Sequence, residues 1–127
     1  MIIDTNISLG NWPFFRYSID TPYRLNYHLK KLDISTGFVS SIEAVLNRDI
    51  DICNKKLIKE VEKYPSLIPV VVISPLLANW EKRLKEYIKL TKIYAVKIYP
   101  TYHSYDISPE FMSSFMEYLK TLKIPLL

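Results

Sequence analysis

Five short apolar segments alternate with four amphipathic stretches along this chain, and this alternation limits the possible folds more than any other feature. The apolar segments are residues 1–9, 36–41, 68–74, 94–99 and 124–127. Residues 68–73 are apolar at every position, which is typical of a strand covered by other elements on both faces. The sequence therefore predicts an α/β fold in which parallel strands are joined by crossover helices.

Each amphipathic stretch begins with a residue suited to capping a helix. These residues are Thr21 before Pro22, Asp49 or Asp51, Asn79, and Ser108 before Pro109. A side-chain oxygen at such a position accepts a hydrogen bond from a free backbone N–H of the first turn. Apolar residues then recur at helical spacing, as in Trp80, Leu84, Tyr87 and Ile88. The aromatic residues in these stretches are interpreted as core.

Length and composition favour one globular domain over residues 1–127, because the chain has 127 residues of which 49% are hydrophobic. No apolar run approaches the roughly 18 residues needed to cross a bilayer. The start, Met1-Ile2-Ile3-Asp4, has neither a basic leader nor a small-residue cleavage site, so we expect a cytoplasmic protein without membrane partners.

Several functional classes are disfavoured by what the sequence lacks. The formal charge of +4 is spread along helices beside glutamates, and the aromatic residues form no nucleic-acid module, so nucleic acid is not an expected partner. Gly10 and Gly37 are the only glycines, which leaves no glycine-rich phosphate loop and no serine hydrolase elbow. The single cysteine, Cys53, is expected to be a buried thiol.

Three segments taken in order carry a resemblance to a known family. They are residues 2–14, which include Gly10-Asn11-Trp12-Pro13-Phe14, residues 39–46, and residues 95–106. Together they resemble the first, second and fourth strands and following loops of the amidohydrolase-related metal-dependent hydrolases of the amidohydrolase 2 type. The resemblance implies a TIM-type (β/α) barrel about twice as long as this chain. This chain would supply about four β-α units and the start of a fifth parallel strand, as the N-terminal half of the barrel.

The resemblance also implies a zinc site that this chain does not match. The first strand of the family carries His-x-His, because residues two apart on a strand project to the same face and can meet one cation. Here those positions are Asn6 and Ser8, and an amide and a hydroxyl are poor zinc ligands. The later ligands of the family would lie beyond Leu127. We therefore predict no metal or other cofactor for this chain, and interpret Asn6 and Ser8 as polar residues lining a pocket.

The fourth apolar segment and its loop supply the remaining candidates for substrate binding. His103, beside Tyr102, is either a substrate contact or acid-base group, or an exposed loop histidine. Lys97 and Tyr99 share one face of a strand, and a lysine there needs a partner because burying an unpaired ammonium is costly. Glu43, which ends the second strand, is the expected partner.

The Glu43 and Lys97 pair has two open interpretations, an anion-binding site or a structural ion pair. Arg16 is either a positive group at the pocket rim or a surface charge. If the chain is catalytic, the candidates are His103, Lys97 and Glu43.

A half barrel would leave two sheet edges and a concave face open. The expected partners are therefore a second copy of the chain or a complementary half-barrel chain, together with a small anionic ligand. The alternative is that the chain is a piece of a longer protein. Two functions follow: a non-catalytic half barrel that binds a ligand or partner, or a hydrolase or decarboxylase for a small carboxylate or cyclic substrate that is active once a missing half completes it.

Overall fold

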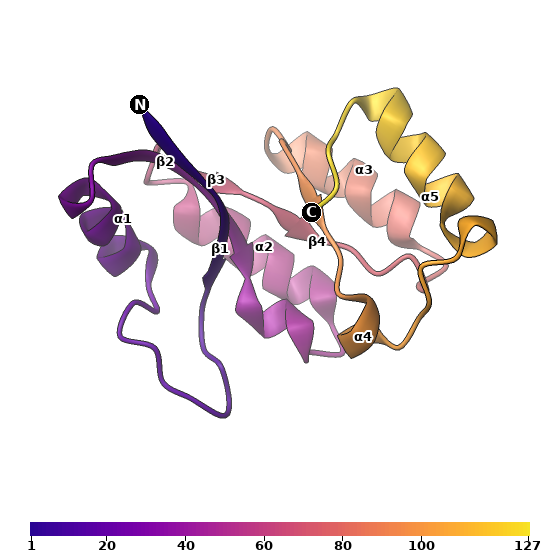
Figure 1. Cartoon of the computed structure of the whole chain (residues 1–127), viewed down its shortest axis with the longest axis horizontal. Coiled ribbons are helices and arrows are strands. Elements are labelled where there is room, and N and C mark those ends of the chain that lie inside the picture. The colour runs from indigo at the N-terminus through magenta and orange to yellow at the C-terminus, as the bar shows by residue number, and fades with distance from the viewer.

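The computed structural model describes all residues from Met1 to Leu127, and strands and helices alternate along most of the chain (Figure 1). The elements are β1 (Ile2–Leu9), α1 (Pro22–Lys31), β2 (Ile34–Ser41), the 3-10 helix η1 (Ile42–Val45), α2 (Ile50–Val61), β3 (Leu67–Pro69), β4 (Val71–Val72), α3 (Trp80–Leu90), β5 (Val96–Lys97), α4 (Pro100–His103) and α5 (Pro109–Leu122). None of the helices is long and apolar enough to cross a membrane.

All strand pairs are parallel, and neighbouring strands follow the order of the chain. β1 pairs with β2, β2 with β3, and β4 with β5. β3 and β4 are two parts of one extended segment that is interrupted at Val70, whose N–H still donates to the carbonyl of Val39 at 2.7 Å. The last residues add a fifth position, because Leu126 forms a parallel bridge with Val96. The predicted α/β class with parallel strands is confirmed, whereas the barrel stays a prediction.

Three of the four predicted helix starts form the expected caps. Thr21, Asp49 and Ser108 each accept a backbone N–H through the side chain at the start of α1, α2 and α5. Asn79 occupies the N-cap position of α3, but its side chain makes no capping hydrogen bond. The beginning of α3 therefore keeps unsatisfied backbone donors, since the first amides of a helix have no partner within the helix.

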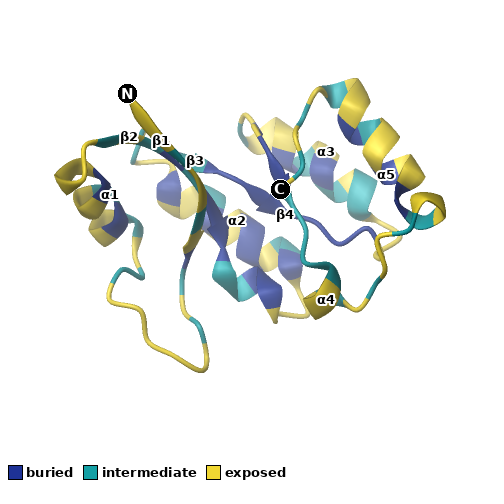
Figure 2. Cartoon of the chain, viewed as in Figure 1, coloured by how far each residue is buried: buried dark blue, intermediate teal, exposed yellow.

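The apolar core lies between the sheet and the helices (Figure 2). At one end, Leu9, Val39 and Leu67 of the strands pack against α1 and α2. At the other end, α3 and α5 lie side by side and bury Tyr87 and Phe115. Gly37 leaves room for side chains at the first of these contacts. A Cβ atom there would lie 2.7 Å from Ile7 Cδ1 and 2.9 Å from Leu29 Cδ1, so these methyl groups would have to shift.

A buried asparagine on α2 forms hydrogen bonds with β4. Asn54, which has no exposed surface, donates from Nδ2 to the carbonyl of Val72 at 2.8 Å and accepts from the Val72 N–H at 2.9 Å. Val72 is also fully buried. One side chain therefore satisfies both backbone groups of a strand residue, in the way that a neighbouring strand otherwise would.

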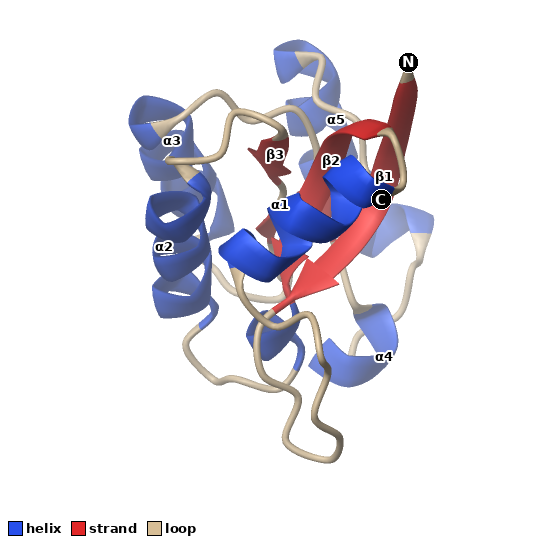
Figure 3. Cartoon of the chain, turned by 90° about the vertical axis from the view of Figure 1, so that its left-hand side faces the viewer, coloured by secondary structure: helices blue, strands red, loops and turns tan.

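The strand β1 forms an open edge of the sheet (Figure 3). It pairs with β2 alone, and its side chains Ile2 and Ile3 are 53% and 44% exposed. The loop after β1 is also largely exposed, with Phe14 at 79% and Phe15 at 64% (Figure 2). An edge of this kind presents unpaired backbone groups and apolar side chains to the surroundings.

Candidate functional site

An irregularity in β1 places the first candidate side chain. Between the pairs Asp4↔Gly37 and Ile7↔Val39, β1 advances by three residues while β2 advances by two. This extra residue is a β-bulge, a feature that changes the direction of side chains at the ends and edges of sheets. Asn6 lies within the bulge, and its N–H donates to Asp4 Oδ1 at 3.0 Å.

The ammonium group of Lys97 connects three strands. Lys97 Nζ donates to Asn6 Oδ1 at 2.5 Å and to Ser40 Oγ at 3.4 Å, and it lies 5.4 Å from the centre of the Tyr99 ring. Asn6 is on β1, Ser40 on β2 and Lys97 on β5. We call these three polar residues and Tyr99 the Lys97 cluster. Its acceptors are uncharged, so the positive charge of Lys97 has no carboxylate partner within the chain.

The Lys97 contact also shows that the sheet is curved. β2 and the β3–β4 segment stand between β1 and β5, so three strand spacings of about 4.8 Å separate β1 from β5 in a flat sheet, or about 14 Å. Side chains that rise from a flat sheet would not close that gap to 2.5 Å. The face that carries the Lys97 cluster is therefore concave.

The predicted pair of Glu43 and Lys97 is wrong. Glu43 instead forms an ion pair with Lys56 of α2, at 3.0 Å and 3.1 Å from its two carboxylate oxygens. The hydrogen bond to Glu43 raises the pKa of Lys56, although burial acts in the opposite direction. Glu43 also accepts from the N–H of Asn11 at 3.3 Å. Glu43 is the second residue of η1, and its contacts connect α2 with the loop that follows β1.

An aromatic group borders the concave face at the carboxyl ends of β1 and β5. Trp12 contacts Tyr102 edge-on at 6.3 Å between ring centres, and Tyr99 lies 6.5 Å from Tyr102 and 6.0 Å from His103. Loops that are far apart in sequence therefore meet here. Carboxyl ends of parallel strands are where α/β proteins of this kind place their binding residues.

His103 ends the short helix α4, where a loop was predicted. Its Nε2 lies 3.1 Å from the carbonyl of Ala44, so Nε2 carries the proton and donates it. The other ring nitrogen, Nδ1, is buried without a partner. His103 is half-buried, so the interpretation of an exposed loop histidine is wrong. Its observed contact joins the loops after β2 and β5.

The remaining candidates have less defined surroundings. Ser8 is exposed and makes no side-chain hydrogen bond, and Arg16 is exposed in the loop after β1 without an ion pair. The structure therefore brings together Asn6, Lys97 and Tyr99, with Tyr102 and His103 beside them, and leaves Arg16 outside these contacts.

The residues present do not fit the zinc that the family resemblance implies. Zinc is held by imidazole, thiolate or carboxylate groups, with three or four protein ligands around one ion. No group of three His, Cys, Asp or Glu side chains lies close enough to hold a metal ion. Asn6, at the first ligand position, is instead bound to the ammonium of Lys97.

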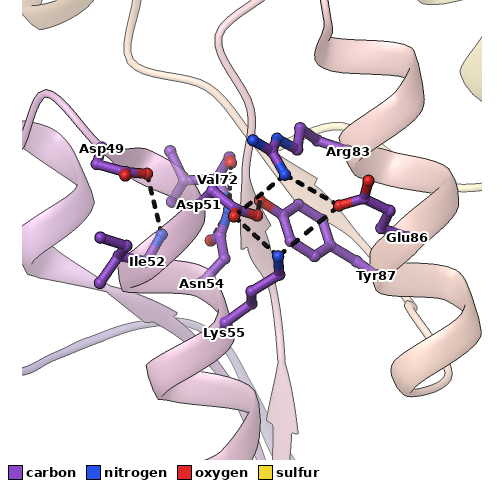
Figure 4. Close-up of polar contacts among 9 residues, drawn as sticks. All are labelled: Asp49, Asp51, Ile52, Asn54, Lys55, Val72, Arg83, Glu86 and Tyr87. Carbon is purple, nitrogen blue, oxygen red and sulfur yellow. Dashed lines mark hydrogen bonds and ion pairs between the residues drawn. The ribbon is translucent and has the colours of Figure 1, made fainter.

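Sequence reasoning missed a second polar group, which joins α2 to α3 (Figure 4). Asp51 accepts from Lys55 at 2.9 Å and from the Tyr87 hydroxyl at 2.8 Å, and it pairs with Arg83 at 3.3 Å. Burial alone would raise the pKa of Asp51, but these hydrogen bonds and the two cations outweigh burial and lower it. Burial and the bond to Asp51 also raise the pKa of Tyr87.

A pocket of about 180 Å³ lies beside this group, between the starts of α2 and α3. Its walls carry apolar and polar residues from both helices and from the end of β4: Arg48, Asp49, Ile50, Asp51, Val72, Ile73, Ser74, Leu77, Asn79, Trp80, Arg83 and Tyr87. None of them belongs to the Lys97 cluster. The spacing of Asp51 and Lys55 is a recognisable helical pair, but nothing in the sequence joins that pair to α3.

Comparisons with known proteins yield a fold and no family. No protein-family model matches the chain, and no match is found among curated proteins. The chain is similar to a crystal structure from Acinetobacter baumannii, described as a probable 2-pyrone-4,6-dicarboxylic acid hydrolase with citric acid bound. The TM-score is 0.63 at 15% identity, and the match covers 98% of this chain but 48% of the other. At this identity the likeness concerns the fold alone.

Proposed function

We propose that residues 1–127 form a single domain equivalent to the N-terminal half of a (β/α) barrel, related to the amidohydrolase-type hydrolases. Two observations support the barrel. The strands are neighbours in the order of the chain, as barrel strands are, and not in the reversed order of a doubly wound sheet. The contact of Lys97 with Asn6 requires a sheet that curls toward closure.

The function that this geometry supports best is binding of a small organic anion on the concave face. The observation that carries the proposal is the Lys97 ammonium, which the amide of Asn6 and the hydroxyl of Ser40 position without neutralising it. A carboxylate that reached Lys97 would gain a charge-assisted hydrogen bond, which is roughly twice as strong as a neutral one. The rings of Tyr99 and Tyr102 would border the apolar part of the ligand.

This binding needs no metal from the chain itself. The zinc of the family has no suitable ligands here, so the positive charge that would attract an anion comes from Lys97. In this proposal Ser8 lies at the border of the ligand and contributes a hydrogen bond, and His103 holds that border in place through its bond to Ala44.

The second candidate function is enzymatic. The similar structure is described as a hydrolase and is about twice as long as the part that this chain matches. A hydrolase or decarboxylase for a small carboxylate or cyclic substrate would follow if a further half supplied the missing groups. The buried, unpaired Nδ1 of His103 favours this candidate, because a buried polar atom without a partner is rare and is often found at catalytic sites.

We further propose that the open sheet is completed by a partner, either a second copy of the chain or a complementary half barrel. The exposed edge strand β1, with Ile2 and Ile3 outward, supports this proposal. Size-exclusion chromatography with light scattering measures the mass directly. A strictly monomeric species that keeps its structure at all concentrations would contradict the proposal that two copies of the chain associate.

Citrate is the first ligand to test for the anion site, with calorimetric titration as the assay. The Lys97→Met variant removes the charge but keeps an unbranched side chain, and we expect at least a tenfold loss of affinity, since a charge-assisted contact contributes about 1.5–3 kcal/mol. Lys92→Met is the matched control, because Lys92 also lies over a tyrosine ring, Tyr94, but just before β5 and outside the cluster.

The two variants separate a specific site from general attraction to a basic protein. Equal losses in Lys97→Met and Lys92→Met, or no citrate binding to the unmodified chain, would show that the Lys97 cluster is not an anion site. A loss confined to Lys97→Met supports the proposal.

A further inference from the structure

The pocket between the starts of α2 and α3 has the features of a second binding site, separate from the concave face. Ser74 is the first of these features. It is only 5% exposed, it lines the pocket, and its hydroxyl makes no hydrogen bond within the chain. The side-chain polar atoms that are fully buried and have no partner are His103 Nδ1 and Tyr105 Oη. The Ser74 hydroxyl is not among them, so it keeps some accessible surface, which faces the pocket. A buried hydroxyl is normally hydrogen-bonded, so the Ser74 hydroxyl is free to form a hydrogen bond with a ligand in the pocket.

The second feature is the start of α3, which forms part of the same wall. Asn79 and Trp80 line the pocket, and the Asn79 side chain leaves the helix uncapped. The backbone N–H groups of Glu81 and Lys82 make no hydrogen bond within the chain. An uncapped start of an 11-residue helix presents donors and a partial positive charge, which favour an anion.

The charges around the pocket leave one cation free. Arg83 is engaged by Asp51 and Glu86, whereas Arg48 makes no ion pair. Two acidic residues line the pocket. Asp51 is paired with Lys55 and Arg83, and the carboxylate of Asp49 caps α2, where it accepts from Ile52 N at 3.2 Å. The lining also includes apolar side chains, among them Leu77 and Trp80.

We propose that this pocket binds a small organic carboxylate with a flat apolar body. The Ser74 hydroxyl, Arg48 and the start of α3 receive the carboxylate, and Leu77 and Trp80 contact the body. A volume of about 180 Å³ suits a molecule of the size of benzoate. The proposal does not depend on the function proposed for the Lys97 cluster, because the two sites share no residue.

Trp80 makes the test direct, because the chain has only two tryptophans. In a Trp12→Phe background the remaining fluorescence comes from Trp80 in the pocket wall. Titration with benzoate is expected to give a saturable change, and the neutral analogue benzamide is expected to bind at least about tenfold more weakly. Ser74→Ala and Arg48→Gln are each expected to weaken benzoate binding about tenfold, whereas Lys92→Met, at a lysine outside both sites, leaves it unchanged.

Asp49→Asn tests whether the pocket favours a negatively charged ligand. Asparagine caps a helix as well as aspartate does, so the variant removes one negative charge and keeps the cap. Benzoate binding is expected to become severalfold tighter. Weaker binding in Asp49→Asn, equal binding of benzamide, affinities unaffected by Ser74→Ala and Arg48→Gln, or no saturable signal with benzoate would each overturn the proposal.

Discussion

The contact between Asn54 and Val72 permits a stability prediction of defined size. We consider the substitution Asn54→Leu, which keeps the branched shape of the side chain and removes both polar atoms. Val72 would lose the partner of its carbonyl at 2.8 Å and of its N–H at 2.9 Å. Because Asn54 and Val72 have no exposed surface, water does not replace the lost bonds.

The magnitude follows from the two backbone groups left unpaired. Each buried, unsatisfied group costs about 1–3 kcal/mol, so the substitution is expected to lower the free energy of unfolding by about 2–6 kcal/mol. Whole domains are stable by only about 5–15 kcal/mol. The variant should therefore remain folded in part and show a large shift of its denaturation midpoint.

Urea denaturation followed by tryptophan fluorescence measures this shift, and Asn79→Leu is the matched control. Asn79 is exposed and its side chain makes no capping hydrogen bond, so the control is expected to change stability by less than about 0.5 kcal/mol. If Asn54→Leu cost less than about 1 kcal/mol, the conclusion that this side chain replaces a strand partner would be refuted.

Three further predictions concern other contacts. The pKa of Asp51 is lowered in the folded state from 3.8, so its contribution to stability is present above that value and is lost as pH falls through the folded pKa. In Asp51→Asn the free energy of unfolding should therefore fall less steeply as the pH is lowered through this range. Gly37→Ala should destabilise by about 1–3 kcal/mol, measured by thermal unfolding, because its Cβ would crowd Ile7 and Leu29, and a neutral result would contradict that crowding. Glu43→Gln should weaken the hold on the loop after β1, seen as faster proteolysis within residues 10–20, while an unchanged cleavage rate would argue against this role.

The alternation of strands and helices and most helix starts could be predicted because their signals are local. A continuous apolar run such as residues 68–73 and a capping residue such as Thr21 act within a few positions of the elements that they specify. The interruption at Val70 and the shortness of β5 were not predictable in this way. They depend on hydrogen bonds to the neighbouring strands, which no short window of sequence contains.

Asn6, Lys97 and Tyr99 of the Lys97 cluster were predicted from the sequence, whereas Ser40 and the contacts between the residues were not. Asn6 was selected because it stands at the first position of the His-x-His pattern, and Lys97 because a lysine on a strand needs a partner. The structure brings the two together. Glu43 was expected to join them, but it turns toward α2 and finds Lys56, thirteen residues further along the chain. The direction of a side chain after the end of a strand depends on the local helical turn, here η1, which hydrophobic periodicity does not reveal.

The order of the strands has a consequence for how the chain folds. If β3 and β4 are taken as one segment, each strand pairs with the next one along the chain, as in Gly37↔Leu67 and Val71↔Val96. Every closing loop therefore spans only one β-α unit. The entropy cost of loop closure rises with loop length, and folding slows when contacts join distant parts of a chain. In this chain every strand pairs with a segment that is close in sequence, so folding is able to proceed from one β-α unit to the next. The folding kinetics should therefore resemble those of repeat proteins, whose units add to their neighbours, more than those of β-sandwiches, whose strands pair across long sequence separations.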